Sequence, residues 1–482
     1  MGSYRRKSVE ESIAATTDAS GSLKKRLGPL DLVVFGIGVI IGAGIFTDGK
    51  GAATYAGPAI VVSLVIGAAC CSLAALCYAE FAAMVPVSGS AYTYSYATLG
   101  EVVAWMVGWD LLLELVLGAS VVVQGWSGYF VHFVGKLGIV WPEVLGPSGT
   151  VDLAAVLLVG LLTLLVARGI KLTSRVNMVL VAVKLFIVLF IVFAGLAYIN
   201  VDNYSPFVPA STPAAPEVGL GAPLLQTLIG QPTSFGVLGI VIGASIVFFD
   251  YIGFDVVATT AEESRNPQRD LPIGIIGSLA ICTVLYVAIT LVLTGMVKYT
   301  DVNEYAAIAS AFERVGNGGF ATVISVGAVA GLTSVVMTLI IGATRVVFSM
   351  SRDHLLPARL SRTSPRTGTP VLLTLIVGLT IAFVAALSPV GNMDELVNIG
   401  ALAAFTLVSA CVPLLRRRRP DLHRPFRVPG SPVLPIVSAV VCFALMLSLS
   451  IDTWLRFVAW TALGLLVYAG YGRRRSRLRA RG

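Results

Sequence analysis

The stretch that decides the fold is Gly36-Ile-Gly-Val-Ile-Ile-Gly-Ala-Gly-Ile-Phe46, which lies inside the first long apolar segment of the chain. Four glycines interrupt what would otherwise be a continuous membrane-spanning helix. Backbone N–H and C=O groups released from helical hydrogen bonds cost several kcal/mol in hydrocarbon, so a break is tolerated only where it is buried in protein or lines a water-filled cavity. The stretch therefore predicts a broken helix whose free backbone groups are available to a ligand.

The groups at such a break indicate the kind of ligand. A half-helix that starts after Gly44 would direct its N-terminal N–H groups and its positive dipole end at the cavity, which suits a carboxylate. The carbonyl groups before the break suit an ammonium group, so together the two sets match an amino acid. The alternative is that Gly38-x-x-x-Gly42 only lets a neighbouring helix approach closely, and this stretch alone does not separate the two interpretations. The glycine spacing does not fit a dinucleotide fingerprint.

The composition is that of a polytopic membrane protein. Of the 482 residues, 56% are hydrophobic and 12% are charged, whereas about 25% of the residues of soluble domains are charged. Apolar segments of about 20 residues, the length that crosses a bilayer as a helix, occur twelve times. These predicted spans cover residues 31–54, 58–84, 101–130, 151–168, 176–199, 236–261, 271–297, 319–349, 370–388, 394–415, 433–450 and 456–472.

The basic residues are distributed asymmetrically between the two sides of the membrane. With the N-terminus in the cytoplasm, 28 of the 34 Lys and Arg residues fall on the cytoplasmic side and five on the other. The positive-inside rule then predicts that both termini are cytoplasmic and that the chain is a multi-pass protein of the plasma membrane. This placement of the net charge of +8 argues against a nucleic-acid partner. We expect no cleavable signal, because the polar stretch Glu10–Ser22 precedes the first apolar segment.

The polar segments divide the chain. We expect residues 1–22 to be a disordered cytoplasmic tail, since they are rich in Ser, Thr, Ala and charge. Spans one to five fall in residues 23–199, an extracellular Pro-rich loop in 200–235, and spans six to ten in 236–415. A basic cytoplasmic loop (416–432), spans eleven and twelve (433–472) and a basic cytoplasmic tail (473–482) follow.

No constellation of side chains predicts an enzyme, a metal site or a cofactor. The six cysteines lie in apolar segments without metal-ligand spacing, and the three histidines are scattered along the chain. A membrane-embedded enzyme would need a convergent nucleophile, base or metal ligands, and Ser, Cys and His show none. A primary pump is disfavoured because the phosphate-binding loop Gly-x-x-x-x-Gly-Lys-[Ser/Thr] does not occur. A channel or a receptor remains as an alternative from another class.

Charged residues inside predicted spans are the next candidates for function. Asp110 and Glu114 are four residues apart in span three and therefore share a helical face, with Glu114 roughly 18 Å into the bilayer. Lys184 lies roughly 12 Å into span five, too deep to reach the headgroups cheaply. It needs a partner or must lose its proton. Thr333 and Ser334 in span eight are weak candidates, since hydroxyls in membrane helices often bond back to their own backbone.

Span six contains a second interruption, Phe249-Asp-Tyr-Ile-Gly-Phe-Asp255, in which two aspartates flank a glycine in mid-membrane. Spans one and six are the first members of two sets of five. Paired breaks in corresponding positions predict an inverted-repeat transporter with its site near the midplane. This second break favours the ligand-binding interpretation of the first.

The chain resembles the amino acid–polyamine–organocation superfamily and, within it, the cationic amino acid transporter family. The resemblance covers nearly all of residues 24–475. Besides Gly36–Phe46, it is carried by Cys77-Tyr-Ala-Glu-Phe81, Val87-Ser-Gly-Ser-Ala-Tyr92, Gly253-Phe-Asp255 with Glu262-Glu263, Asn266-Pro-Gln-Arg-Asp-Leu-Pro-Ile273, Thr344-Arg345 and Ser349-Met-Ser-Arg-Asp353. It implies an all-α fold of twelve transmembrane helices with a five-plus-five inverted repeat and broken helices one and six. Twelve spans suggest a bacterial-type member.

The resemblance also implies roles for matching residues. The substrate's α-carboxylate and α-amine would be held by Ile40, Ile41, Gly42, Ala43 and Gly44. The sixth span would contribute Phe249, Tyr251, Ile252 and Asp255, and Glu114 matches an acidic position of the family's third helix. Lys184 matches a fifth-helix lysine placed where sodium-coupled relatives bind sodium, and Thr333 and Ser334 lie near that place.

Asp250 departs from the family pattern, which usually has a small residue at this position. Its carboxylate could bind a cationic side chain or pair with Lys184. The sequence thus predicts a proton-coupled secondary transporter that imports amino acids, with protons and the bilayer as partners, and that accepts lysine, arginine or ornithine. The alternative within the superfamily is an amino acid or polyamine exchanger.

Overall fold

Apolar helices provide almost all of the regular structure in the computed structural model, which describes residues 7, 9–14, 23, 25–42, 44, 55–136, 138–147, 149–213, 219–225, 233–301, 307–387 and 393–477. In these ranges the extended structure is a two-residue pairing of β1 (Thr212–Pro213) with β2 (Thr233–Ser234), antiparallel, with Thr212 opposite Ser234. The all-α class predicted from the sequence is confirmed.

The first half of the chain forms α1 (Val9–Ala14), α2 (Pro29–Ile40), α5 (Ile60–Met84), α6 (Ala91–Thr98), α7 (Glu101–Lys136), α8 (Leu153–Ala167) and α9 (Ile170–Leu196). The second half forms α11 (Gly236–Val247), α12 (Phe254–Thr259), α13 (Pro267–Met296), α14 (Ala307–Arg314), α15 (Gly318–Arg352), α16 (Val371–Leu387), α17 (Asp394–Arg418), α18 (Val433–Leu447), α19 (Ile451–Val467) and α20 (Arg473–Arg475). Short 3-10 turns include η5 (Phe248–Tyr251), η6 (Ala261–Glu263) and η8 (Ala358–Ser361).

The lengths of these helices fit a multi-pass membrane protein. In the described part of the chain, eight helical segments are long and apolar enough to cross a membrane. Four shorter apolar helices, α2, α8, α16 and α18, accompany them. These helices overlap the apolar segments predicted from the sequence, although α2 covers only the first part of the predicted span 31–54. The polytopic character of the chain is confirmed.

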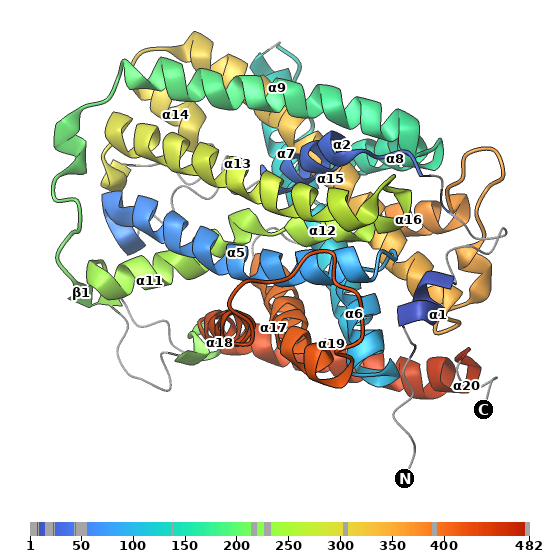
Figure 1. Ribbon diagram of the computed structural model, residues 1–482. Coiled ribbons are helices and arrows are strands. Elements are labelled where there is room, and N and C mark those ends of the chain that lie inside the picture. Colours follow the sequence, from blue (N-terminus) through green and yellow to red (C-terminus); the bar gives the residue numbers. More distant parts are fainter. Residues whose placement is uncertain are drawn as a thin grey trace.

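The two broken helices lie among the long ones (Figure 1). Helix α13 packs against α2, α5 and α9, while α7 and α15 pack against each other and α15 also contacts α2 and α12. Helices α17, α18 and α19 form the lower flank in Figure 1, and α1 and α20 lie at the lower right. Helix α2 is therefore enclosed by α9, α12, α13 and α15, which supply the side chains that meet its broken end.

Helix α9 shows how one helix faces both hydrocarbon and protein. Val179, Phe186 and Phe193 follow one another at intervals of seven residues and are all more than 60% exposed. Lys184 and Val188, on the opposite face, are fully buried. The exposed apolar face is what a lipid-facing helix requires, and the buried face places Lys184 against α2.

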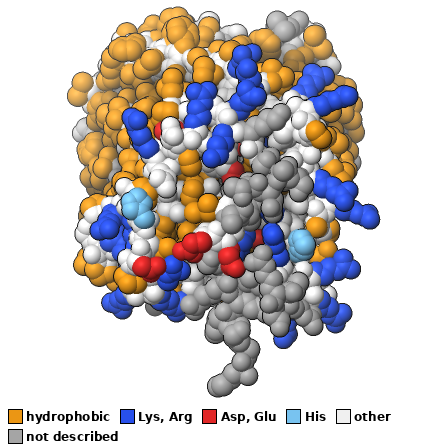
Figure 2. Space-filling model, turned by 45° about the vertical axis from the view of Figure 1, so that its right-hand side comes forward, with side chains coloured by type: hydrophobic (Ala, Val, Ile, Leu, Met, Phe, Trp, Pro, Cys, Tyr) orange, Lys and Arg blue, Asp and Glu red, His pale blue; other side chains and the backbone are white. Residues whose placement is uncertain are grey.

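Several polar segments gather at one end of the bundle, which we call the basic end because Arg168, Arg352, Arg418 and Arg475 end or follow helices there. Thr369 Oγ1 donates to Ala167 O, Arg418 donates to Thr98 O, and Arg477 N donates to Asp353 O, so these helix ends are in contact. Figure 2 shows Lys and Arg side chains spread over a face of the molecule beside hydrophobic surface.

The predicted disordered tail needs a correction at this end. The described residues of segment 1–22 are Lys7 and the helix α1, and they are docked rather than free. Lys7 Nζ donates to Asp353 Oδ1 at 2.5 Å, and the Tyr92 hydroxyl donates to Asp353 Oδ2 at 2.8 Å. Lys7, Val9 and Ser12 are buried. Composition did not predict this because the partner of Lys7 is 346 positions away in the chain.

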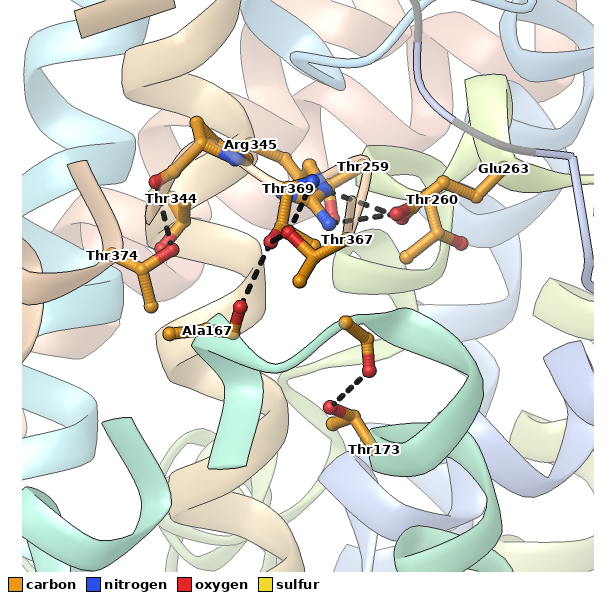
Figure 3. Close-up of polar contacts among 12 residues, drawn as sticks. Ala167, Thr173, Thr259, Thr260, Glu263, Thr344, Arg345, Thr367, Thr369 and Thr374 are labelled. Atoms are coloured by element: carbon orange, nitrogen blue, oxygen red, sulfur yellow. Dashed lines mark hydrogen bonds and ion pairs between the residues drawn. The ribbon is translucent and has the colours of Figure 1, made fainter. Parts of the chain in front are cut away.

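Buried ion pairs hold the basic end together. Arg345 of α15 donates through two nitrogens to Glu263, with 2.7 Å between Nη2 and Oε1 (Figure 3). Both side chains are only 1% exposed. Arg352, two turns further along α15, binds Glu262 in the same bidentate way. These pairs join α15 to the chain that follows α12.

The buried pair between Arg345 and Glu263 gives a stability prediction. Replacing Arg345 by Met leaves Glu263 buried without its cation, so the free energy of unfolding should fall by about 3–5 kcal/mol. The double variant Arg345→Met, Glu263→Gln should recover part of this loss. Arg456→Met, which breaks a pair with Asp452 whose side chains are 43% and 35% exposed, should cost no more than about 1 kcal/mol.

Denaturant unfolding in detergent, followed by tryptophan fluorescence, measures all three variants. A loss for Arg345→Met as small as that for Arg456→Met would show that the buried pair does not hold the basic end together.

Candidate functional site

Helix α2 stops inside the molecule. It begins at Pro29, where Asp31 Oδ2 accepts a hydrogen bond from Gly28 N, and it ends at Ile40. Ile41 has a ψ of 86°, outside the helical region. The break falls at Ile41 and Gly42 as the glycines predict, and the described residues Ile40, Ile41, Gly42 and Gly44 are all buried. Ala43 lies outside the described residues.

The second break is resolved completely. Helix α11 ends at Val247, the chain makes the 3-10 turn η5, and Ile252 is extended with a ψ of 139°. Gly253 then adopts a φ of +122°, which an L side chain rarely adopts, and α12 begins at Phe254. The mid-span interruption predicted from this sequence is therefore present.

The two breaks face each other. A Cβ on Gly253 would lie 2.3 Å from Val39 Cγ1, and one on Gly44 would lie 1.6 Å from Asp250 Oδ1. Tyr286 of α13 lies between the two breaks, with its hydroxyl within hydrogen-bonding distance of Ile40 O and, at 3.0 Å, of Asp250 O. The structure thus brings Ile40, Gly44 and Asp250 together around one small volume.

The alternative interpretation of the glycines also holds in part. A Cβ on Gly36 would lie 2.3 Å from Ser278 Oγ of α13, too close for a side chain, and one on Gly38 would lie 3.0 Å from Asn177 Oδ1 of α9, a tight contact. Close helix packing therefore explains the first two glycines of the stretch. The last two, Gly42 and Gly44, lie at the break itself.

Lys184 binds the end of α2. Its ammonium donates to Gly38 O at 3.1 Å and to Ile41 O at 2.5 Å. Ser334 of α15 reaches the same Gly38 carbonyl at 3.2 Å. Among the described residues, Lys184 forms no ion pair, including none with Asp250. Lys184 and Ser334 therefore meet at the Gly38 carbonyl, and carbonyl oxygens take the place of a carboxylate partner for Lys184.

Thr333 is not brought to this place. Its hydroxyl donates to Val329 O of its own helix at 2.7 Å. Tyr251 likewise points away from α2, because its hydroxyl donates to Leu64 O of α5 at 3.1 Å. The neighbouring residues Phe249, Asp250 and Ile252 are half-buried, whereas Tyr251 is buried, and of these residues Asp250 lies against Gly44.

Three carboxyl groups lie deeper in the bundle. Asp110, Glu114 and Asp255 are at most 5% exposed. Within the part of the chain that the structure describes, both oxygens of Glu114 and one each of Asp110 and Asp255 have no hydrogen-bond partner. Glu114 and Asp255 are close enough for their charges to interact. A buried carboxyl without a partner must be neutral or must be met by a cation.

Sequence reasoning missed the role of Tyr286, which connects the two breaks, and that of the Gly38 carbonyl, which two side chains share. A single tyrosine in an apolar span carries no signal of its own. The described residues contain no group of three His, Cys, Asp or Glu side chains that could hold a metal ion. What the arrangement offers a ligand is backbone groups, one lysine and carboxylates.

Comparison with known proteins gives a consistent result. Residues 27–468 match the family described as amino acid permease. The chain is 42% identical to the methylthioribose transporter of Bacillus subtilis (strain 168), covering 99% of this chain and 100% of that protein. It is 41% identical to the branched-chain amino acid permease BcaP of the same organism, covering 98% of each chain. It is 36% identical to the vacuolar cationic amino acid transporter 4 of Arabidopsis thaliana, over 86% of this chain and 67% of that one.

The contact between Gly253 and Val39 gives a test of the site's backbone geometry. Gly253→Ala should lower the free energy of unfolding by about 1–3 kcal/mol for the φ of +122° alone, and further because the methyl group collides with Val39. Gly128→Ala in α7 is the control, since an added Cβ there has no neighbour within 4 Å. It should change stability by less than about 1 kcal/mol. Denaturant unfolding measures both, and equal effects would contradict the facing breaks.

Proposed function

This chain belongs to the amino acid permease family, and we propose that it is a secondary active transporter that imports amino acids across the plasma membrane. The single observation that carries the proposal is the pair of facing helix breaks at Gly42–Gly44 and Phe249–Gly253. Midplane breaks of this kind leave backbone groups that can bind the charged ends of an amino acid. The family match supports transport, and we infer the direction and the energy source below.

We infer that the chain crosses the membrane twelve times. Eight long and four shorter apolar helices support this count, and a helix shorter than a bilayer thickness can cross when a non-helical segment completes the span. Residues 23–199 and 236–415 would form two inverted repeats of five spans, each starting with a broken helix. Residues 200–235 would lie outside the cell. The basic end would face the cytoplasm, with both termini, because Lys and Arg are enriched there.

We infer that the substrate binds between the two breaks. Its α-carboxylate would meet the N–H groups at Gly42, Ala43 and Gly44. Three carbonyls at the end of α2, those of Gly38 and Ile40 and of Ile41 directly after the helix, already accept hydrogen bonds from protein side chains. The α-ammonium would therefore lie toward the second break, near the Asp250 carboxylate that rests against Gly44. Phe249 and Ile252 would border the substrate side chain.

We infer that Lys184 couples transport to protons. A charged lysine that is fully buried and bound only to carbonyls is held in place by its own charge. If Lys184 lost its proton, its hydrogen bonds to the Gly38 and Ile41 carbonyls would weaken, and α2 could then move relative to α9. A bound sodium ion could make the same carbonyl contacts, which is why the protonated lysine can replace it.

The coupling proposal is tested with purified protein in proteoliposomes. The native protein should accumulate substrate along an inward proton gradient and should be indifferent to sodium. Lys184→Met should lose gradient-driven accumulation by at least tenfold while it still exchanges bound substrate. Lys298→Met, at an exposed lysine, is the control and should accumulate normally. Sodium-dependent uptake by the native protein, or normal accumulation by Lys184→Met, would contradict the role of Lys184.

The substrate side chain is a finer proposal. The names of the three relatives give their substrates as methylthioribose, branched-chain amino acids and cationic amino acids, respectively. We propose that cationic amino acids, lysine, arginine or ornithine, are accepted here. Asp250 lies against Gly44, and Glu114 lies deeper in the bundle, close enough to Asp255 for their charges to interact. If both Asp250 and Glu114 faced the substrate, its α-ammonium would neutralise only one of them. The extra negative group favours a second positive charge on the substrate.

Asp250→Ala should therefore shift the preference of the transporter. The ratio of lysine to leucine uptake, measured as kcat/KM, should fall by about tenfold or more, because a partly buried charge pair contributes at least about 1.5 kcal/mol. Asp202→Ala, at an exposed aspartate, should leave the ratio unchanged. Preferential uptake of leucine or methylthioribose by the native protein would reject the cationic proposal and keep that of a transporter.

A further inference from the structure

A basic cleft of about 300 Å³ lies at the basic end, away from the two breaks. It is lined by Arg26, Arg168, Lys171, Arg175 and Arg366, together with Gly169, Ile170, Leu172 and Thr367. The five cations come from three separate parts of the chain: the segment before α2, the turn and first helical turns from α8 into α9, and the loop between η8 and α16. Among the described residues, no acidic side chain lines the cleft.

Hydrogen bonds hold the backbone of the segment before α2 against the chain that follows α12, and hold the loop before α16 against the end of α8. Arg26 N and Leu27 N both donate to Glu263 O, at 2.7 and 2.9 Å, and Arg265 N donates to Leu27 O. Thr369 Oγ1 lies 3.1 Å from Ala167 O and 2.8 Å from Thr367 Oγ1, which ties the loop before α16 to the end of α8 (Figure 3). The backbone that carries the cations is therefore held in place, and their convergence does not depend on loose loops.

These cations differ from the other basic residues nearby. Arg345, Arg352 and Arg416 each bind a carboxylate. Among the described residues, Arg26, Arg168, Lys171 and Arg175 have no carboxylate within 4 Å. Positive charges brought together without anions repel one another, so an anion that enters the cleft is favoured. The positive-inside rule explains why these residues are basic, but it does not explain why they converge on one cleft.

The surroundings of the cleft indicate where the anion comes from. Ile170 and Leu172 contribute apolar surface to the lining. One and two turns beyond Arg175 and Lys171 on α9, Val179 and Met178 are 63% and 41% exposed, and Leu161 and Leu164 of α8 are 65% and 58% exposed. Figure 2 shows basic side chains bordering hydrophobic surface. A molecule with a phosphate and acyl chains would place the phosphate among the cations and its chains along α8 and α9.

We propose that this cleft is a binding site for the phosphate headgroup of an anionic glycerophospholipid. Basic pockets between transmembrane helices on the cytoplasmic side are suited to such headgroups. A bound lipid would connect Arg26, directly before α2, to the α8–α9 turn and to the loop before α16. It would thereby stabilise the arrangement at the basic end without contact with the substrate site.

Lipid binding to the purified protein tests the proposal. Native mass spectrometry and thermal unfolding, with titrated phosphatidylglycerol or phosphatidylcholine, should show at least tenfold tighter retention of phosphatidylglycerol. The variant Arg168→Gln, Lys171→Gln, Arg175→Gln should bind it about 100-fold more weakly, from about fivefold for each cation. The matched control Arg473→Gln, Arg474→Gln, Arg475→Gln removes the same charge from the same end and should retain the lipid.

Two further measurements cover the cases in which the triple Gln variant does not fold or the bound anion is not a lipid. If the triple Gln variant does not fold, Arg168→Lys with Arg175→Lys keeps the charge and should keep the lipid, while Lys171→Glu should weaken binding. Inorganic phosphate at millimolar concentration should not displace phosphatidylglycerol, and displacement would identify a soluble anion instead of a lipid. Equal retention of the two lipids, or equal loss in the cleft and control variants, would overturn the proposal. The readout is binding, so the result is independent of the proposed transport.

Discussion

The constraint on which the structure depends is that a helix broken inside an apolar bundle exposes backbone groups that need partners. At the end of α2, side chains from neighbouring helices supply these partners. Lys184 from α9 and Ser334 from α15 share the Gly38 carbonyl, Lys184 also binds Ile41 O, and Tyr286 from α13 reaches Ile40 O. The helices around α2 are thus joined by the groups that the break released. The break is therefore a structural junction, and we propose that it is also the ligand site.

The buried acidic side chains at the basic end and in the interior differ in whether they have a partner. At the basic end, Glu262, Glu263 and Glu80 each bind an arginine. In the interior, Glu114 has no hydrogen-bond partner among the described residues. Matched buried charges contribute rigidity to the basic end, whereas an unmatched buried carboxyl is costly unless a proton or a cation joins it. This contrast is why we place substrate and proton chemistry in the middle of the bundle.

Part of the geometry around the two breaks could be predicted because its signals are local. Glycines mark both breaks, and a lysine far inside an apolar run needs a buried partner, so the breaks at Gly42 and Gly253 and the deep position of Lys184 were identifiable from the sequence. Their partners were not. Run length locates a helix but leaves its rotation undetermined. Both hydroxyls were expected to bond back to their own backbone, and both do, but the sequence did not indicate that Ser334, unlike Thr333, also lies within hydrogen-bonding distance of the Gly38 carbonyl of α2. Tyr286 has no charge to mark it, and Lys7 pairs with a residue at the far end of α15. These contacts depend on how helices pack, which periodicity alone does not give.

The central claim, that the two breaks form one substrate site, can be measured by hydrogen exchange of the protein in nanodiscs. Lysine, leucine and methylthioribose are added separately, and exchange is compared with that of the ligand-free protein. The account predicts that an accepted substrate slows amide exchange in the peptides over residues 36–46 and 248–256 together, with no change in α18 or α19. Protection of only one break, or protection confined to another part of the chain, would contradict it.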